Sequence, residues 1–194
     1  MTMQEYQGLA MRTSPEGHDR RLNGCLGLIG ETGEIVDALK KWLFQSGEGA
    51  PFPTDRIIDE CGDTLWYCAE LAEGMGITLA EIQEKAVAIF ARDVRRENAK
   101  ASAVTCAVRL SWEASLPYAD LFDAESPDDE GLTAWQHEQA IAEIASVLAR
   151  IEELLERFCG TGLETAMRRN IGKLRQRYPD GFDPERSMHR TENA

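Results

Sequence analysis

The placement of the prolines constrains the fold more than any other feature of this chain. They punctuate long stretches in which apolar residues recur every three or four positions, and no stretch keeps up a strict apolar/polar alternation. Proline breaks helices, so it is expected between them. The pattern therefore predicts an all-α fold, a helical bundle, in a single domain over residues 1–194. The prolines are Pro15, Pro51, Pro53, Pro117, Pro127, Pro179 and Pro184.

Helix limits follow from caps, glycines and periodicity. We expect helices over residues 2–11, 18–45, 54–74, 79–96, 133–158 and 163–178. The third helix has Thr54 as its predicted N-cap. Its apolar positions at helical spacing predict the buried face. These positions are Ile58, Cys61, Leu65, Cys68, Ala72 and Met75.

Charge and cysteine content exclude several classes of protein. Asp and Glu number 34 against 21 Lys and Arg, a net charge of −13, which disfavours binding to nucleic acid or to anionic membranes. No apolar run is long enough to span a membrane, and residues 1–17 do not resemble a secretory signal. The five cysteines form no CxxC pair, so neither disulfides nor a zinc framework is expected. Together these features predict a cytoplasmic protein.

Two pairs of acids carry the chemical information. Glu31 and Glu34 are three residues apart in one predicted helix, and Glu60 and Asp63 are three apart in the next. Residues three apart project from one side of a helix, so two antiparallel helices can bring four carboxylates together. Such carboxylates repel one another unless they are protonated or bind a cation, and oxygen donors suit Mg²⁺, with Mn²⁺ as the alternative. The alternative interpretation is that these acids form an exposed helix face that only makes the protein soluble.

The acids lie in unusually apolar and glycine-rich surroundings. The nine residues before Glu31 carry no charge, and Asp63 is the only charged residue of CGDTLWYCA. Glycines recur at positions 24, 27, 30 and 33. Each destabilises a helix by up to about 1 kcal/mol relative to alanine, which favours a close approach of another backbone or a ligand. A break in the helix near residues 24–33 is the alternative.

These residues match a known pattern. GLIGETGEIVDALKKWLF (27–44) followed by IIDECGDTLWYCAELAEGMGITLAEI (57–82) resembles the MazG-like branch of the all-α nucleoside triphosphate pyrophosphohydrolases, whose signature is ExxE, a spacer and ExxD. The segment NIGKLRQRYPDGF (170–182) is similar to the one that closes the short members of that family. The resemblance implies the helical bundle of the all-α pyrophosphatase type, and a homodimer or tetramer.

The chain departs from short members of that family by an insertion. We expect residues 1–96 to form the metal-binding half, residues 97–165 an inserted or degenerate helical half, and residues 166–194 a phosphate-binding helix and tail. Residues 58–71 line up with residues 141–154, where Ser146 replaces Asp63. A decayed duplication and a chance likeness of two amphipathic helices both explain this match.

The resemblance also implies a reaction and its residues. It implies Mg²⁺-dependent cleavage of a nucleoside triphosphate to the monophosphate and pyrophosphate, with Glu31, Glu34, Glu60 and Asp63 holding the metal. One acid, Glu31 or Glu34, would activate the water. The expected substrate-binding residues are Asn170, Lys173, Arg177, Tyr178, Trp66 and Lys41.

Other motifs contribute little. His137-Glu138 lacks the second histidine of a zinc protease motif, no P-loop is present, and the acidic stretch from Asp123 to Gly131 lacks the glycine of an EF-hand loop. The competing function is that of a catalytically inactive all-α interaction or regulatory module. In that case the acids are structural or regulatory.

Overall fold

The computed structural model describes residues 1–93, 102–123 and 132–185, and every regular element in these ranges is helical. The predicted all-α class is therefore confirmed. The elements are α1 (Met3–Met11), α2 (Arg20–Phe44), α3 (Thr54–Gly74), α4 (Leu79–Asp93), α5 (Ala103–Glu113), α6 (Leu116–Tyr118), the π-helix η1 (Ala119–Asp123), α7 (Ala134–Leu154), the π-helix η2 (Leu155–Cys159) and α8 (Leu163–Arg177).

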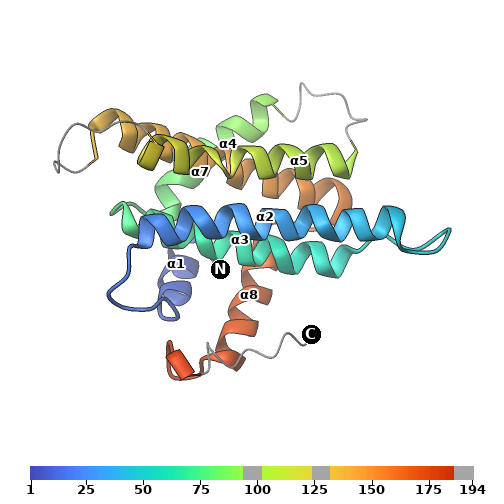
Figure 1. Ribbon diagram of the computed structural model, residues 1–194, viewed down its shortest axis with the longest axis horizontal. Coiled ribbons are helices and arrows are strands. Elements are labelled where there is room, and N and C mark those ends of the chain that lie inside the picture. The colour runs from blue at the N-terminus through green and yellow to red at the C-terminus, as the bar shows by residue number, and fades with distance from the viewer. Residues whose placement is uncertain (94–101, 124–131, 186–194) are drawn as a thin grey trace.

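The antiparallel pair of α2 and α3 forms the middle layer of the bundle (Figure 1). Helices α4, α5 and α7 cover one side of this pair, while α1 and α8 pack against α3 on the other. The buried side chains form one continuous apolar core that draws on both sides. The middle pair is thus enclosed between the two outer groups, and α8 crosses α3 where the sequence places its acids.

Most of the predicted helix limits agree with the structure to within a few residues. The whole predicted buried face of α3 is buried, from Ile58 to Met75. Thr54 is the first helical residue rather than the N-cap, a position that Pro53 occupies without a side-chain hydrogen bond. The helix predicted over 133–158 starts after Thr133 and continues from α7 into η2, ending at Gly160 in a left-handed conformation (φ 67°). Helix α5 was not predicted.

Two of the four glycines on α2 lie at close contacts. A β-carbon on Gly24 would lie 2.9 Å from the Cα of Leu71, so α2 and α3 touch backbone to backbone there. On Gly27 it would lie 2.0 Å from Cδ1 of Tyr67. Gly30 and Gly33 have nothing within 4 Å of that position. Close approach therefore accounts for the first two glycines, and α2 runs unbroken through all four.

We expect opposite effects from two alanine substitutions on α2, six residues apart. Gly24→Ala should lower the free energy of unfolding by about 1–3 kcal/mol, because its methyl group must push α3 away. Gly30→Ala should raise it by about 0.5–1 kcal/mol, because the site is open and alanine favours a helix. Urea denaturation measures both, and equal shifts would contradict the assigned contact.

All five cysteines are free, and Cys25, Cys61, Cys68 and Cys106 are buried. Among the described residues, none of the helices has the length and apolar character needed to cross a membrane. The acidic stretch 124–131 and the end of the tail, 186–194, lie outside the described residues. The proposed division into two halves and a C-terminal segment stays a prediction.

Candidate metal and ligand site

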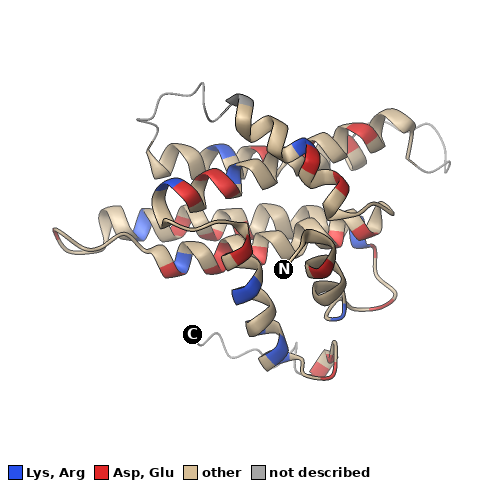
Figure 2. Cartoon of the chain, turned by 180° about the vertical axis from the view of Figure 1, so that it is seen from behind, with Lys and Arg blue, Asp and Glu red and all other residues tan. Residues whose placement is uncertain are grey.

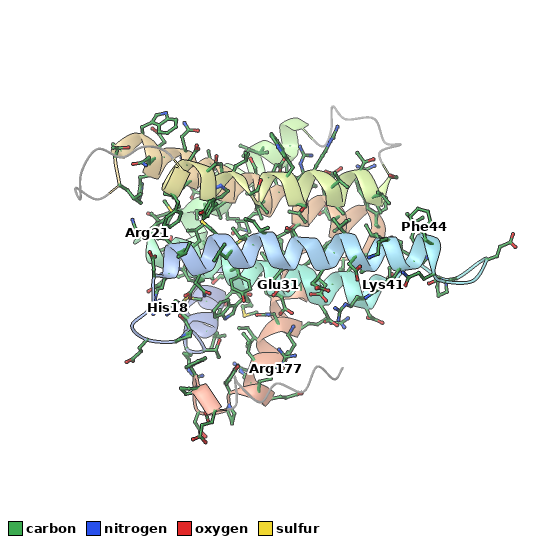
Figure 3. All side chains as sticks on the ribbon, in the orientation of Figure 1. His18, Arg21, Glu31, Lys41, Phe44 and Arg177 are labelled. Atoms are coloured by element: carbon green, nitrogen blue, oxygen red, sulfur yellow. The ribbon has the colours of Figure 1, made fainter. Side chains whose placement is uncertain are left out.

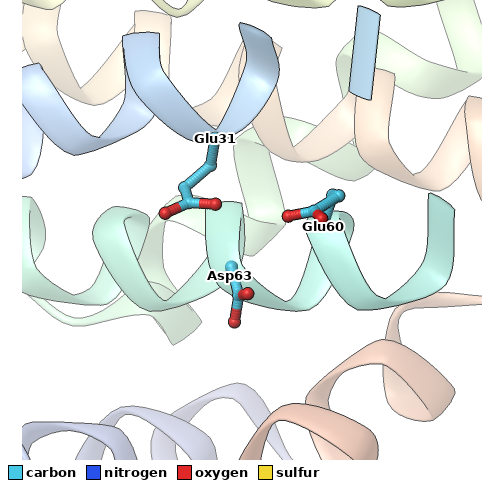
Figure 4. Close-up of side chains that lie close together, drawn as sticks. All are labelled: Glu31, Glu60 and Asp63. Atoms are coloured by element: carbon cyan, nitrogen blue, oxygen red, sulfur yellow. The ribbon is translucent and has the colours of Figure 1, made fainter. Parts of the chain in front are cut away.

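Three of the four acids meet between α2 and α3. One carboxylate oxygen from each of Glu31, Glu60 and Asp63 lies within 4.8 Å of the other two. Figure 4 shows Glu31 reaching down from α2 toward the two acids of α3. The i,i+3 spacing of Glu60 and Asp63 places both on the side of α3 that faces Glu31. The three carboxylates form an oxygen-rich group of the kind that holds a hard divalent cation.

Two acids of this group, Glu31 and Glu60, have raised pKa values. Burial, together with repulsion from Asp63 and Glu60, raises the pKa of Glu31 from 4.5 to about 7. Burial also raises the pKa of Glu60, against the opposing effect of Arg56. The nearby Glu60 side chain also favours the protonated form of Glu31. A divalent cation would take the place of that proton, so the donor set fits such an ion.

The raised pKa of Glu31 predicts a pH-dependent stability. Between about pH 4.5 and about pH 7 the folded chain keeps a proton on Glu31 that the unfolded chain has lost. Its stability therefore falls as the pH rises through this window. Glu31→Gln should remove this decline and be more stable than wild type at about pH 8 by about 1–2 kcal/mol, after discounting for solvent screening. Urea denaturation in EDTA measures the two curves, and parallel curves would count against the cause given.

Helix α8 brings its polar side chains to the same place. Asn170 Nδ2 donates to Asp63 Oδ1 at 2.8 Å, and the Lys173 ammonium bonds both oxygens of Asp63. A β-carbon on Gly62 would lie 3.0 Å from the carbonyl oxygen of Ala166, so glycine permits this close crossing. The Tyr6 hydroxyl donates to Asn170 Oδ1 at 2.9 Å. This contact holds the orientation of the Asn170 amide.

An ion-pair cluster beside the site secures the same crossing. Arg169 Nε and Nη2 donate to the two oxygens of Asp59 at 2.8 and 2.9 Å, and its Nη1 donates to Asp55 at 2.7 Å. Figure 2 shows basic positions on α8 below the acidic positions of the middle layer. These contacts hold the cationic face of α8 against the acidic face of α3.

An open pocket of about 230 Å³ lies next to the acids. Glu31 and Asp63 line one part of it, and Trp66, Asn170, Arg177 and Tyr178 contribute further walls. Lys173 reaches the site through Asp63. The structure thus brings five of the expected substrate-binding residues to one region. The remaining lining residues are Thr13, Pro15, Asn23, Tyr67, Leu174 and Phe182.

Glu34 and Lys41 lie apart from this group, contrary to the expected arrangement. The Glu34 side chain is 53% exposed and contacts Arg56 at 3.5 Å, while Arg56 contacts Glu60 Oε1 at 2.6 Å. Arg56 thus stands between the fourth carboxylate and the other three. Lys41 pairs with Asp37 at 2.7 Å and lines a separate pocket near the end of α2 (Figure 3).

Several residues of the site were missed from the sequence. Gly62 carries a usable signal, since it sits between Glu60 and Asp63 and is costly inside a helix. Arg56 also carries a usable signal, because it lies four residues before Glu60 on the same helix. Tyr6 and Asn23 carry none, because their roles depend on partners in other helices.

Comparison with known proteins gives a short match. The chain is 34% identical over 61 residues to the Gene 37 protein of Mycobacterium phage L5, a match that covers 31% of this chain and 54% of that protein. The chain thus spans about half the length of the curated relative it matches. No protein-family model matches the chain, and no solved structure matches it.

Proposed function

We propose that the protein is a Mg²⁺-dependent nucleoside triphosphate pyrophosphohydrolase of the MazG-like type, which cleaves a (d)NTP to the monophosphate and pyrophosphate. The observation that carries this proposal is the meeting of Glu31, Glu60 and Asp63 beside a pocket that also presents Asn170 and Arg177. Acidic and cationic groups are thus combined at one pocket. A metal-bound polyphosphate needs both, because the acids hold the cation while the cationic groups bind phosphate oxygens.

The three clustered acids are the residues that would hold the cation. When bound, Mg²⁺ supplies charge neutralisation for the phosphates and lowers the pKa of a water. Glu31 accepts the proton of the attacking water in this proposal. We assign that role to Glu31 rather than Glu34 because Glu31 lines the pocket, whereas Glu34 is half exposed and pairs with Arg56.

Helix α8 supplies the phosphate-binding groups. Lys173 leaves Asp63 and contacts phosphate oxygens, and Arg177 at the end of the same helix binds the outgoing pyrophosphate. Water attacks the α-phosphorus, its proton passes to Glu31, and the bond between the α-phosphorus and the bridging oxygen breaks. The products are the nucleoside monophosphate and pyrophosphate.

Product analysis tests the proposal. Purified protein is incubated with each of the common NTPs and dNTPs and Mg²⁺, and products are separated by ion-exchange chromatography. We expect monophosphate and pyrophosphate from at least one nucleotide, and loss of the reaction in EDTA. Release of orthophosphate would contradict the assigned bond. The competing function, an inactive interaction module, predicts cation binding without turnover of any nucleotide.

A further inference from the structure

A second polar cluster reaches the same pocket through Asn23, which is one of the lining residues. Glu70 of α3 is fully buried, and its Oε1 accepts hydrogen bonds from Ser14 at 3.1 Å and from His18 Nε2 at 2.5 Å. Asn23 Nδ2 donates to the same oxygen at 3.5 Å. The proposed reaction uses none of these groups. Burying a carboxylate costs free energy, and a buried carboxylate does not improve solubility. Glu70 is therefore expected to have another role.

The contact with Glu70 orients the Asn23 amide. Asn23 donates to Glu70 through Nδ2, so the NH₂ end of the amide faces Glu70. The other end of the amide is the carbonyl oxygen, Oδ1, and Asn23 lines the pocket. Oδ1 of Asn23 can therefore accept a hydrogen bond from a donor group of a ligand in the pocket.

The position of Asn23 along α2 suits contact with the base of a nucleotide whose phosphates lie at the acids. It lies eight residues before Glu31, which corresponds to about 12 Å along the helix. Gly27 lies midway, and the Tyr67 ring occupies the space that a side chain would fill there. Tyr67 meets Trp66 edge to face with ring centroids 4.9 Å apart, and both rings line the pocket. Along α2 the order is therefore Glu31, the Tyr67 ring beside Gly27, and then Asn23.

Trp66 is fixed as a wall of this pocket. Its Nε1 donates to the carbonyl oxygen of Ala10 at 3.2 Å and to Thr13 Oγ1 at 3.0 Å. The indole N–H is therefore already used inside the protein. What the ring offers to a ligand is its apolar surface, which suits stacking with a flat base.

We infer that Asn23 is the residue that selects the nucleobase, by accepting a hydrogen bond from a ring or exocyclic N–H of the base at Oδ1, with Glu70 as its positioning residue. This inference rests on the proposed function, since it places the phosphates at Glu31 and Asp63. The base then lies between the aromatic rings and the amide, and the preferred base is the one whose N–H meets Oδ1. Ser14 and His18 hold Glu70 in turn.

Binding of the four 2′-deoxynucleoside monophosphates in EDTA tests the inference without turnover. Titration calorimetry on the wild type should show one monophosphate bound more tightly than the rest. Asn23→Ala should weaken that binding by about tenfold, the equivalent of about 1.4 kcal/mol, and reduce the preference among bases. Leu26→Ala on the same helix is the matched control, because Leu26 is 54% exposed and lies outside the pocket lining.

A second variant tests whether Glu70 orients the Asn23 amide or merely stabilises the fold. Glu70→Gln keeps the shape of the side chain but can donate to Asn23, so the amide is free to turn its NH₂ end into the pocket. We expect the preference among bases to change while Mn²⁺ affinity stays at the wild-type value. Circular dichroism confirms that each variant is folded.

The outcomes distinguish this inference from the proposed function. Equal affinity for all four monophosphates in the wild type, or an unchanged preference in both variants, would overturn the role of Asn23 even if triphosphates are hydrolysed. Asn23-dependent binding without pyrophosphate release would refute the hydrolase and leave the base site standing.

Discussion

Asp63→Asn should abolish nucleotide hydrolysis while leaving the fold intact. Asparagine has nearly the same shape, and its Oδ1 still accepts from Asn170 and Lys173, so α8 stays in place. The variant loses the negative charge that would help to hold the cation. We expect pyrophosphate release to fall by about 10³-fold, the range found when one electrostatic catalytic group is removed. Mn²⁺ affinity, measured by electron paramagnetic resonance, should weaken in parallel.

Asp59→Asn is the control for this experiment. Asp59 lies one turn earlier on α3 and pairs with Arg169 outside the three-acid group. Its partly exposed ion pair contributes about 0–1 kcal/mol, so a small loss of stability is expected with near-normal turnover and cation binding. Equal loss of activity in both variants would show that α8 placement, rather than the charge at Asp63, is responsible.

The fold was predictable wherever a helix is long and amphipathic. The limits of α3 and α8 follow from periodicity and from the glycines and prolines at their ends. Helix α5 was missed although Ala103, Cys106, Ala107 and Leu110 show helical spacing, because its 11 residues are short and carry few strong helix signals. The π-helical continuation of α7 has no sequence pattern of its own, and Leu155 is its buried residue.

The candidate site was predictable only in part, for a geometrical reason. Three residues turn a helix through about 300°, which leaves i and i+3 about 60° apart around the axis. For Glu60 and Asp63 this offset keeps both on the face toward Glu31. For Glu31 and Glu34 the same offset sends Glu34 to the exposed edge, where Arg56 binds it. Spacing shows which acids share a side, but not which neighbouring helix each one faces.

Lys173 occupies the position that a cation would need. Its ammonium bonds both oxygens of Asp63, and both side chains are about three-quarters buried. A metal ion that uses Asp63 must displace this contact. In the proposed mechanism Lys173 therefore competes with the ion, and once displaced it would be available for phosphate. In that mechanism the same side chain would oppose cation binding and assist phosphate binding.

Lys173→Met should therefore raise cation affinity and lower turnover. Removing the ammonium leaves Asp63 without its ion-pair partner, and we expect Mn²⁺ binding to tighten by about tenfold, or about 1.4 kcal/mol. Hydrolysis should fall by about 10²-fold through loss of a phosphate contact. Lys173→Arg keeps the charge and should leave cation affinity near the wild-type value. Weaker Mn²⁺ binding in the methionine variant would show that Lys173 supports the site instead of competing for it.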